Sequence, residues 1–423
     1  MGRENRIPNR RRTAFAQRKA WLLLAALLLN PFCVARLALR DGRIDPPTRY
    51  CLAWMGWLAV VAGLCLLLFR REQTRRHLQA RWPSYLLTAA SVLMALVVAE
   101  VVLELADDRL KPRQFHVENY EFRFDVKLNS QGFRDAEFSR EKPSGVRRIL
   151  AIGDSFVYGV GVDEDDSIPR RMEALLNRSG RARYQVFNLG VPGANPTGYA
   201  ETARRFVACQ PDLALLVFYV DNDVSLGRFG PAGIRRFALW RLFERVSDKL
   251  FAEADYAWAR NYDIDLFYRE KAVRGEINPL LLVRASSFDD EQAYYDDLVR
   301  RFESNPGVRA KLIEIRDLFA PVPLLVAIVP SKYQTNPESI PELEKIGFHF
   351  RDRRVADDGI QRALGAFLKK SEVAFVDLMP EVVASQQQTG RSHYFTIDDH
   401  FNELGYELAA RVLAERVSDL LEK

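Results

Sequence analysis

Three long apolar runs near the start of the chain set its first part apart from the rest. They cover residues 20–38, 50–69 and 85–104, and the second run contains no charged residue. Because a helix needs roughly 20 residues to cross the hydrocarbon core of a bilayer, we expect three transmembrane helices within residues 20–106. A signal peptide would also fit the first run, but no small-residue cleavage pattern follows it, so we expect a retained helix.

Beyond the third run, short strand-like and helix-like segments alternate. Residues 107–145 are expected to form a linker with short strands, because "YEFRFDVKLNSQGFRD" alternates apolar and polar positions. Residues 402–421 repeat apolar side chains at helical spacing, with Asn402 as a candidate N-cap. Five apolar runs typical of buried strands stand at residues 148–152, 184–188, 213–220, 323–330 and 373–378. This alternation predicts an α/β domain over residues 146–423, with a mainly parallel sheet covered by helices on both faces in a three-layer sandwich.

The interval between the third and fourth predicted strands is too long for a single crossover helix. A helical insertion is expected over about residues 225–310, with a helical pattern from Ile234 to Phe251 and many aromatic residues over 229–268. Two interpretations remain open. The insertion forms either an extra helical layer packed on the sheet, or the lid or wall of a substrate cleft on whose aromatic rings sugars stack.

Charge is distributed unevenly along the chain. Residues 1–111 hold 18 lysines and arginines against 8 aspartates and glutamates, a net charge of +10, whereas the remaining residues hold 43 against 48, a net charge of −5. Seven of the basic residues lie in residues 1–19, four in residues 36–49 and five in the loop expected at residues 70–84. Because these residues flank the apolar runs, they indicate membrane topology and not nucleic-acid binding.

The positive-inside rule gives this topology an orientation. It places the basic N-terminus, residues 1–19, and the second loop in the cytoplasm, and everything after residue 107 outside. We therefore expect a multi-pass protein of the inner (cytoplasmic) membrane with a periplasmic large domain. The four cysteines form neither a CxxC pair nor a metal-type cluster with histidine, so no metal is expected.

Small and polar residues follow the first three buried strands. Because the carboxyl ends of parallel strands share one edge of a sheet, these residues can converge on one cleft. A serine hydroxyl, an imidazole, a carboxylate, a side-chain amide and glycine-flanked N–H groups are the parts of nucleophilic acyl transfer. The segments are Gly153-Asp154-Ser155, Asn188-Leu189-Gly190-Val191-Pro192-Gly193, Asp221-Asn222-Asp223 and, before the last helix, Asp398-Asp399-His400.

Each of these segments is weak when it is taken alone. A Gly-Asp-Ser turn after a strand is commonly plain turn chemistry, and His349 and His393 compete with His400 as the base. Other glycine-rich sites fit worse, since "GDSFVYGVGV" lacks the P-loop and dinucleotide patterns. The α/β-hydrolase elbow also fails, because Val157 stands where its second glycine belongs.

Together, the segments resemble the sequence blocks of the SGNH (GDSL) hydrolases. "GDSF" resembles the first block, which implies Ser155 as the nucleophile and as a backbone donor to the oxyanion. "NLGVPG" and "VDND" resemble the second and third blocks, which implies Gly193 and Asn222 as the other oxyanion donors. "DDHFN" resembles the last block, which implies Asp398 and His400 as the remaining members of a catalytic triad. Candidate supporting residues are Asp154, Asn188 and Asp223.

Two departures from the family pattern stand in this sequence. Val220 occupies the usual glycine position of the third block. The usual D-x-x-H is shortened to D-x-H, because Ile397 lies three residues before His400 and Asp398 two residues before it. This short spacing is similar to that of alginate-type O-acetyltransferases and other envelope members of the superfamily. Asp399 is the alternative carboxylate.

The resemblance implies a membrane-anchored serine esterase that removes ester-linked acyl groups, foremost acetyl, from envelope or extracellular glycans without a cofactor. Two alternatives stay open. One is an O-acyltransferase that uses the same triad on a cell-envelope polysaccharide, and the other is a non-catalytic glycan-binding member of an export or modification complex. The expected partners are an acylated glycan or other ester substrate, the lipid bilayer, and membrane-bound polysaccharide synthesis or acylation proteins, but no nucleic acid.

Overall fold

The computed structural model describes the chain in two compact units. One unit comprises Met1–Asp108 with Ile234–Asn261, and the other comprises Arg109–Gly233 with Tyr262–Lys423. The residues described are 55–61, 63, 72–110, 113–178, 180, 182–224, 226, 242, 268, 270–271, 276–277, 291–351 and 357–422.

A long apolar helix, α4 (Glu72–Leu110), contains the third predicted span. Among the described residues, its segment Gln79–Glu104 alone is long and apolar enough to cross a membrane, with a mean hydropathy of 2.5. Of the second predicted span, residues 55–61 and 63 are helical. The rest of that span and the whole first span lie outside the described residues, so three spans are not confirmed.

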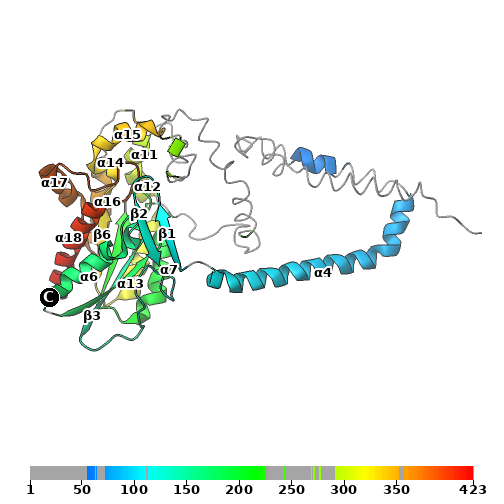
Figure 1. Ribbon diagram of the computed structural model, residues 1–423, viewed down its shortest axis with the longest axis horizontal. Coiled ribbons are helices and arrows are strands. Elements are labelled where there is room, and N and C mark those ends of the chain that lie inside the picture. Colours follow the sequence, from blue (N-terminus) through cyan, green and yellow to red (C-terminus); the bar gives the residue numbers. More distant parts are fainter. Residues whose placement is uncertain are drawn as a thin grey trace, which may run out of the picture. The chain divides into compact units, whose positions relative to one another are not determined.

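The sequence predicts a loop at residues 70–84, but the structure shows a helix in the part of this segment that it describes. Residues 72–84 belong to α4, because glutamate, glutamine, arginine, leucine and alanine there are all good helix formers. Pro83 lies inside this helix, where its ring removes one backbone hydrogen bond and bends the axis. Figure 1 shows a bend toward the N-terminal end of α4.

A five-stranded parallel sheet forms the centre of the second unit. The five apolar runs predicted as strands are its five strands, which confirms the predicted α/β class. Their spatial order is β4-β3-β5-β6-β7, so the chain winds from β3 to one side and then to the other. The ends of β3, β4 and β5 therefore lie side by side at the point where the strand order reverses, which is where ligands bind in such sheets. The strands are β3 (Val146–Gly153), β4 (Arg183–Gly190), β5 (Leu213–Tyr219), β6 (Leu324–Val329) and β7 (Ala374–Asp377).

Helices cover both faces of this sheet (Figure 1). On one face α6 (Ile168–Arg178) packs against α18 (Glu403–Leu421), and on the other α7 (Pro196–Phe206) packs against β3 and α13 (Pro306–Phe319). Every residue of β5 and β6 is buried, as expected for strands covered on both sides. Further helices are α5 (Ser155–Tyr158), η1 (Glu164–Asp166), η2 (Val207–Cys209), α11 (Glu291–Asp296), α12 (Leu298–Ser304), α14 (Lys332–Thr335), η5 (Pro337–Ser339), α15 (Ile340–Lys345), α16 (Gly359–Lys370) and α17 (Met379–Thr389).

The last helix begins as the sequence predicts. The side chain of Asn402 accepts hydrogen bonds from the N–H groups of Leu404 (3.0 Å) and Gly405 (3.2 Å) at the start of α18. Most of the insertion predicted over residues 225–310, including the helical pattern from Ile234 to Phe251, lies outside the described residues. Its end carries the helices α11 and α12.

Residues 107–145 are expected to be a linker with short strands, but residues 107–110 still belong to α4. Further along this segment, β1 (Gln114–Glu118) and β2 (Arg123–Lys127) form an antiparallel hairpin. Phe124 and Val126 of β2 are buried and pack with Tyr158 of α5. The hairpin therefore belongs to the packing of the α/β unit, next to the helix that carries the candidate nucleophile.

Candidate active site

Ser155 is the first residue of α5, two residues after β3 ends at Gly153. The buried side chain of Asp154 caps this helix, because it accepts a hydrogen bond of 3.0 Å from the N–H of Phe156. Ser155 itself is 8% exposed. The strand, the tight turn and the short helix thus hold the serine hydroxyl at the carboxyl edge of the sheet.

A very close approach of two backbones supports this turn. A Cβ atom at Gly190, the last residue of β4, would lie 2.2 Å from the backbone nitrogen of Tyr158 and 2.7 Å from the carbonyl carbon of Val157. Real Cβ atoms do not approach backbone atoms so closely. A side chain at Gly190 therefore has to displace α5, and Ser155 with it.

We expect Gly190→Ala to lower the free energy of unfolding by about 1–3 kcal/mol, the usual effect of overpacking, and to lower ester hydrolysis in the folded fraction. Thermal unfolding and turnover of the purified protein measure both effects. Gly56→Ala is the control, since Gly56 lies in the helical residues 55–61, has no positive φ, and a Cβ there meets nothing within 4 Å. Equal effects of the two variants would contradict the steric explanation.

The structure brings Ser155, His400 and Asp398 together. The Nε2 atom of His400 lies 2.7 Å from Oγ of Ser155. The Nδ1 atom of the same imidazole contacts Oδ1 of Asp398, which also accepts the backbone N–H of His400 at 3.0 Å. The imidazole is 18% exposed. A carboxylate, an imidazole and a hydroxyl are thus joined in one hydrogen-bonded chain.

Electrostatics favour a charged carboxylate in this chain. Burial acts to raise the pKa of Asp398, but the nearby imidazole and its hydrogen bonds outweigh burial, so the pKa lies below its usual value. Burial acts to lower the pKa of His400, but Asp398 outweighs it and the pKa is raised above 6.5. Asp398 is therefore ionised at neutral pH and stabilises the protonated imidazole.

The competing residues have other partners. Nε2 of the buried His393 lies 2.9 Å from Oγ of Ser385, and His349 is exposed. Asp399 lies 3.2 Å from Nζ of Lys332, not against the imidazole. The two neighbouring aspartates thus have different partners.

The three predicted oxyanion donors stand on neighbouring strand ends. Gly193 follows β4 in a turn that resembles type II, because Pro192 precedes it, its φ is +73°, and the N–H of Ala194 donates to the carbonyl of Val191 (2.9 Å). Asn222 follows β5 and donates from Nδ2 to Oδ2 of Asp154 (3.2 Å). Gly193 and Asn222 are exposed, so the donor groups lie at an accessible edge.

Comparisons with known proteins identify the family. The family described as GDSL-like lipase/acylhydrolase matches residues 151–408, more than half of the chain. The chain belongs to this family. Its enzyme class is therefore that of an ester hydrolase.

Solved structures related to this GDSL-like acylhydrolase are distant in sequence. A lipase/acylhydrolase from Enterococcus faecalis is 13% identical, with a TM-score of 0.35, over 64% of this chain and 96% of that chain. A member of the lipolytic G-D-S-L family from Veillonella parvula is 12% identical, with a TM-score of 0.33, over 64% and 98%. An SGNH-hydrolase family esterase is 16% identical, with a TM-score of 0.29, over 66% and 99%. None of the curated proteins matches the sequence significantly.

The predicted supporting residues shape the strand ends of the acylhydrolase. Oδ1 of Asn188 accepts the N–H of Gly190 (3.0 Å) at the end of β4. Asp223 is fully buried, accepts hydrogen bonds from the Tyr199 hydroxyl (2.8 and 2.9 Å) and from the N–H of Tyr219 (2.9 Å), and so holds the turn that presents Asn222. Burial raises the pKa of Asp223 well above its usual value.

Several charged residues around the site could not be recognised in the sequence. Arg134 is fully buried and donates to the carbonyls of Gly159 (2.6 Å) and Val162 (2.8 Å) behind α5. Glu121 and Lys332 contact the loop that carries Asp398. A single arginine, glutamate or lysine in a loop is commonly exposed, so nothing in the local sequence distinguishes them. In the described part of the chain, no group of three or more His, Cys, Asp or Glu residues is arranged to hold a metal.

Proposed function

We propose that this acylhydrolase is a serine esterase in which Ser155, His400 and Asp398 form the catalytic triad. The observation that carries the proposal is the unbroken chain from the Asp398 carboxylate through both imidazole nitrogens to the Ser155 hydroxyl, with 2.7 Å between Nε2 and Oγ. Such an arrangement activates a hydroxyl that is otherwise a weak nucleophile.

The proposed reaction passes through an acyl-enzyme. Oγ of Ser155 attacks the ester carbonyl carbon while Nε2 of His400 takes the hydroxyl proton, and Asp398 stabilises the imidazolium. The tetrahedral oxyanion accepts hydrogen bonds from the N–H groups of Ser155 and Gly193 and from the Asn222 amide. The imidazolium then protonates the leaving alcohol. Water then attacks the acyl-serine while His400 takes its proton, and the imidazolium returns this proton to Oγ of Ser155 as the acid leaves.

For location and substrate, we propose a multi-pass anchor in the cytoplasmic membrane and hydrolysis of acyl esters, acetyl above all, on envelope glycans in the periplasm. The apolar segment Gln79–Glu104 and the basic residues that flank the apolar runs support the anchor. An enzyme held at the membrane meets polymers that are assembled and modified there.

Transfer is the second candidate function, because the D-x-H spacing of Asp398 and His400 is similar to that of envelope O-acetyltransferases. The triad would be the same, and a sugar hydroxyl would attack the acyl-serine in place of water. The hydrogen-bonded triad favours both enzymatic functions over a binding protein that has no catalysis.

Envelope glycans from cells with and without the gene separate these functions. For the esterase we expect glycan acetylation, measured by mass spectrometry, to rise on deletion and to return to its original level when the wild-type gene, but not the Ser155→Ala form, is restored. A fall in acetylation would identify a transferase. Unchanged acetylation would show that the substrate lies elsewhere.

A further inference from the structure

The loop that carries Asp398 is held by two side chains that lie far away in the sequence. The carboxylate of Glu121 accepts the N–H of Ile397 (2.9 and 3.0 Å) and the N–H of Asp398 (2.6 Å). From Lys332 at the start of α14, Nζ donates to the carbonyls of Thr396 (3.2 Å), Ile397 (3.0 Å) and Asp398 (3.1 Å). Five main-chain groups of three consecutive residues thus bond to a glutamate and a lysine.

Glu121 and Lys332 carry opposite charges and differ in how deeply they are buried. Lys332 is fully buried and also pairs with Asp399 at 3.2 Å. Glu121 is partly buried. Burial raises its pKa, while its hydrogen bonds to the loop and the charge of Lys332 act to lower it. Because a buried ion costs free energy unless it is paired, removing the charge of Lys332 leaves Glu121 and Asp399 poorly compensated, whereas removing Glu121 leaves Lys332 still paired with Asp399.

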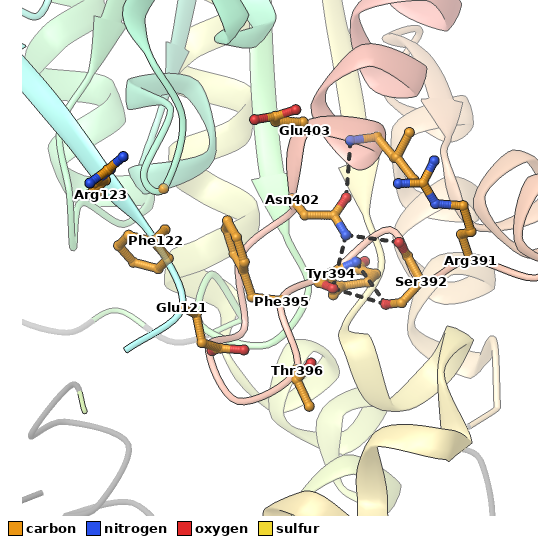
Figure 2. A pocket seen from close by; sticks show the side chains of 12 residues that line it. Glu121, Phe122, Arg123, Arg391, Ser392, Tyr394, Phe395, Thr396, Asn402 and Glu403 are labelled. Carbon is orange, nitrogen blue, oxygen red and sulfur yellow. Dashed lines mark hydrogen bonds between the residues drawn. The ribbon is translucent and has the colours of Figure 1, made fainter. Parts of the chain in front are cut away.

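The hairpin turn that carries Glu121 is itself well ordered by local contacts. Oδ1 of Asn119 accepts the N–H groups of Glu121 (2.9 Å) and Phe122 (2.8 Å), as in an Asx turn. The ring of Phe122 packs against Phe395 of the catalytic loop, with 4.8 Å between the centroids. Figure 2 shows Glu121 with its carboxylate directed toward the chain that carries Phe395 and Thr396.

The loop that carries Asp398 borders a hollow on the side that faces the hairpin. A hollow of about 670 Å³ lies between the hairpin and residues 391–404, and Thr396 and Glu121 both line it (Figure 2). Beside this hollow, the main chain of the loop donates hydrogen bonds to Glu121 and accepts hydrogen bonds from Lys332.

We propose that Glu121 is a positioning residue of the active site which, together with Lys332, fixes the main chain of residues 396–398 so that His400 faces Ser155. Glu121 precedes the family match over residues 151–408, and its hairpin starts four residues after α4 ends at Leu110. The segment that follows the apolar helix in sequence thus contributes directly to the catalytic geometry. This inference rests on the proposed triad.

The test compares Glu121→Ala, Glu121→Gln and the matched control Glu118→Gln in the full-length protein. Glu118 lies at the end of β1 in the same hairpin and is exposed. We expect Glu121→Ala to lower kcat for p-nitrophenyl acetate by about 10²-fold, as for other small misplacements of catalytic groups, with KM nearly unchanged. Glu121→Gln should lose less, because its amide oxygen can still accept both N–H groups, and Glu118→Gln should match the wild type.

Fluorophosphonate labelling of Ser155 and thermal unfolding accompany the kinetics. Slower labelling of folded Glu121 variants supports the proposal, and a folded Glu121→Ala with wild-type kcat overturns it. If Glu121→Ala does not fold, Glu121→Asp decides, because its shorter side chain cannot reach both N–H groups, and wild-type kcat in that variant also overturns the proposal. If the wild type is neither active nor labelled, the proposed triad fails and this inference fails with it. An active wild type with unaffected variants refutes the positioning role alone.

Discussion

Ser155→Ala should lower kcat for a small activated ester such as p-nitrophenyl acetate by about 10⁴–10⁶-fold, the range seen when the nucleophile of a triad is removed. The variant loses the atom that attacks the carbonyl carbon but keeps the backbone N–H at this position. Because the hydroxyl contacts only the imidazole among the hydrogen bonds of the described site, the fold should survive. Steady-state kinetics and thermal unfolding of the purified protein measure both expectations.

Labelling with a fluorophosphonate probe makes this prediction sharper, since the probe reacts with an activated serine and not with serines in general. Wild-type protein should be labelled, and Ser155→Ala should not. Ser304→Ala is a matched control, because Ser304 is an exposed serine on α12 that has no part in the site. Strong labelling of folded Ser155→Ala would falsify the assignment of Ser155 as the nucleophile.

Asp398→Asn should lower kcat by about 10⁴-fold and move the pH dependence of the remaining activity. An asparagine at this position cannot stabilise the imidazolium and can hold the imidazole in the wrong tautomer. The carboxylate at position 398 is also the main group that raises the pKa of His400 above its usual value.

The direction of the pH effect follows from the role of the base. His400 must be neutral to take the serine proton, so kcat/KM falls as the pH is lowered through the pKa of His400. In the wild type this acid limb should lie above pH 6.5, the ordinary value, because the pKa of His400 is raised. In Asp398→Asn, burial continues to lower this pKa while the main opposing charge is gone, so the limb should move to lower pH.

Asp399→Asn provides the comparison for this experiment. Asp399 also raises the pKa of His400, but its carboxylate pairs with Lys332 and not with the imidazole. The acid limb should therefore shift in the same direction with a much smaller loss of kcat. If Asp399→Asn causes the larger loss of kcat, Asp398 is not the carboxylate of the triad.

The hairpin of β1 and β2 does more than connect α4 to the sheet along the chain, because it also holds the loop that carries Asp398. Because Glu121 bonds to the backbone of Asp398 and Phe122 packs against Phe395, a shift of this hairpin reaches the triad directly. A fragment of the enzyme designed from the family match alone would lack this residue.

The sequence was sufficient to predict the sheet and its strands, and it also named the residues that are proposed as the triad. Strands covered on both faces are apolar throughout, so β5 and β6 stand out as continuous runs of hydrophobic residues. The polar segments after β3, β4 and β5 could also be recognised in the sequence. Their convergence followed because parallel strands place their carboxyl ends at one edge. Local patterns of this kind depend only on neighbours along the chain.

Only the tertiary structure decided which of the competing side chains meet. His393 and His400 lie seven residues apart and look alike in sequence, yet one bonds to Ser385 and the other to Ser155. Glu121 lies more than 270 residues from the loop that it holds. Such contacts depend on the relative positions of segments that are distant along the chain. No periodicity, cap or turn signal records those positions, whereas strands and caps follow from residues within a few positions of one another.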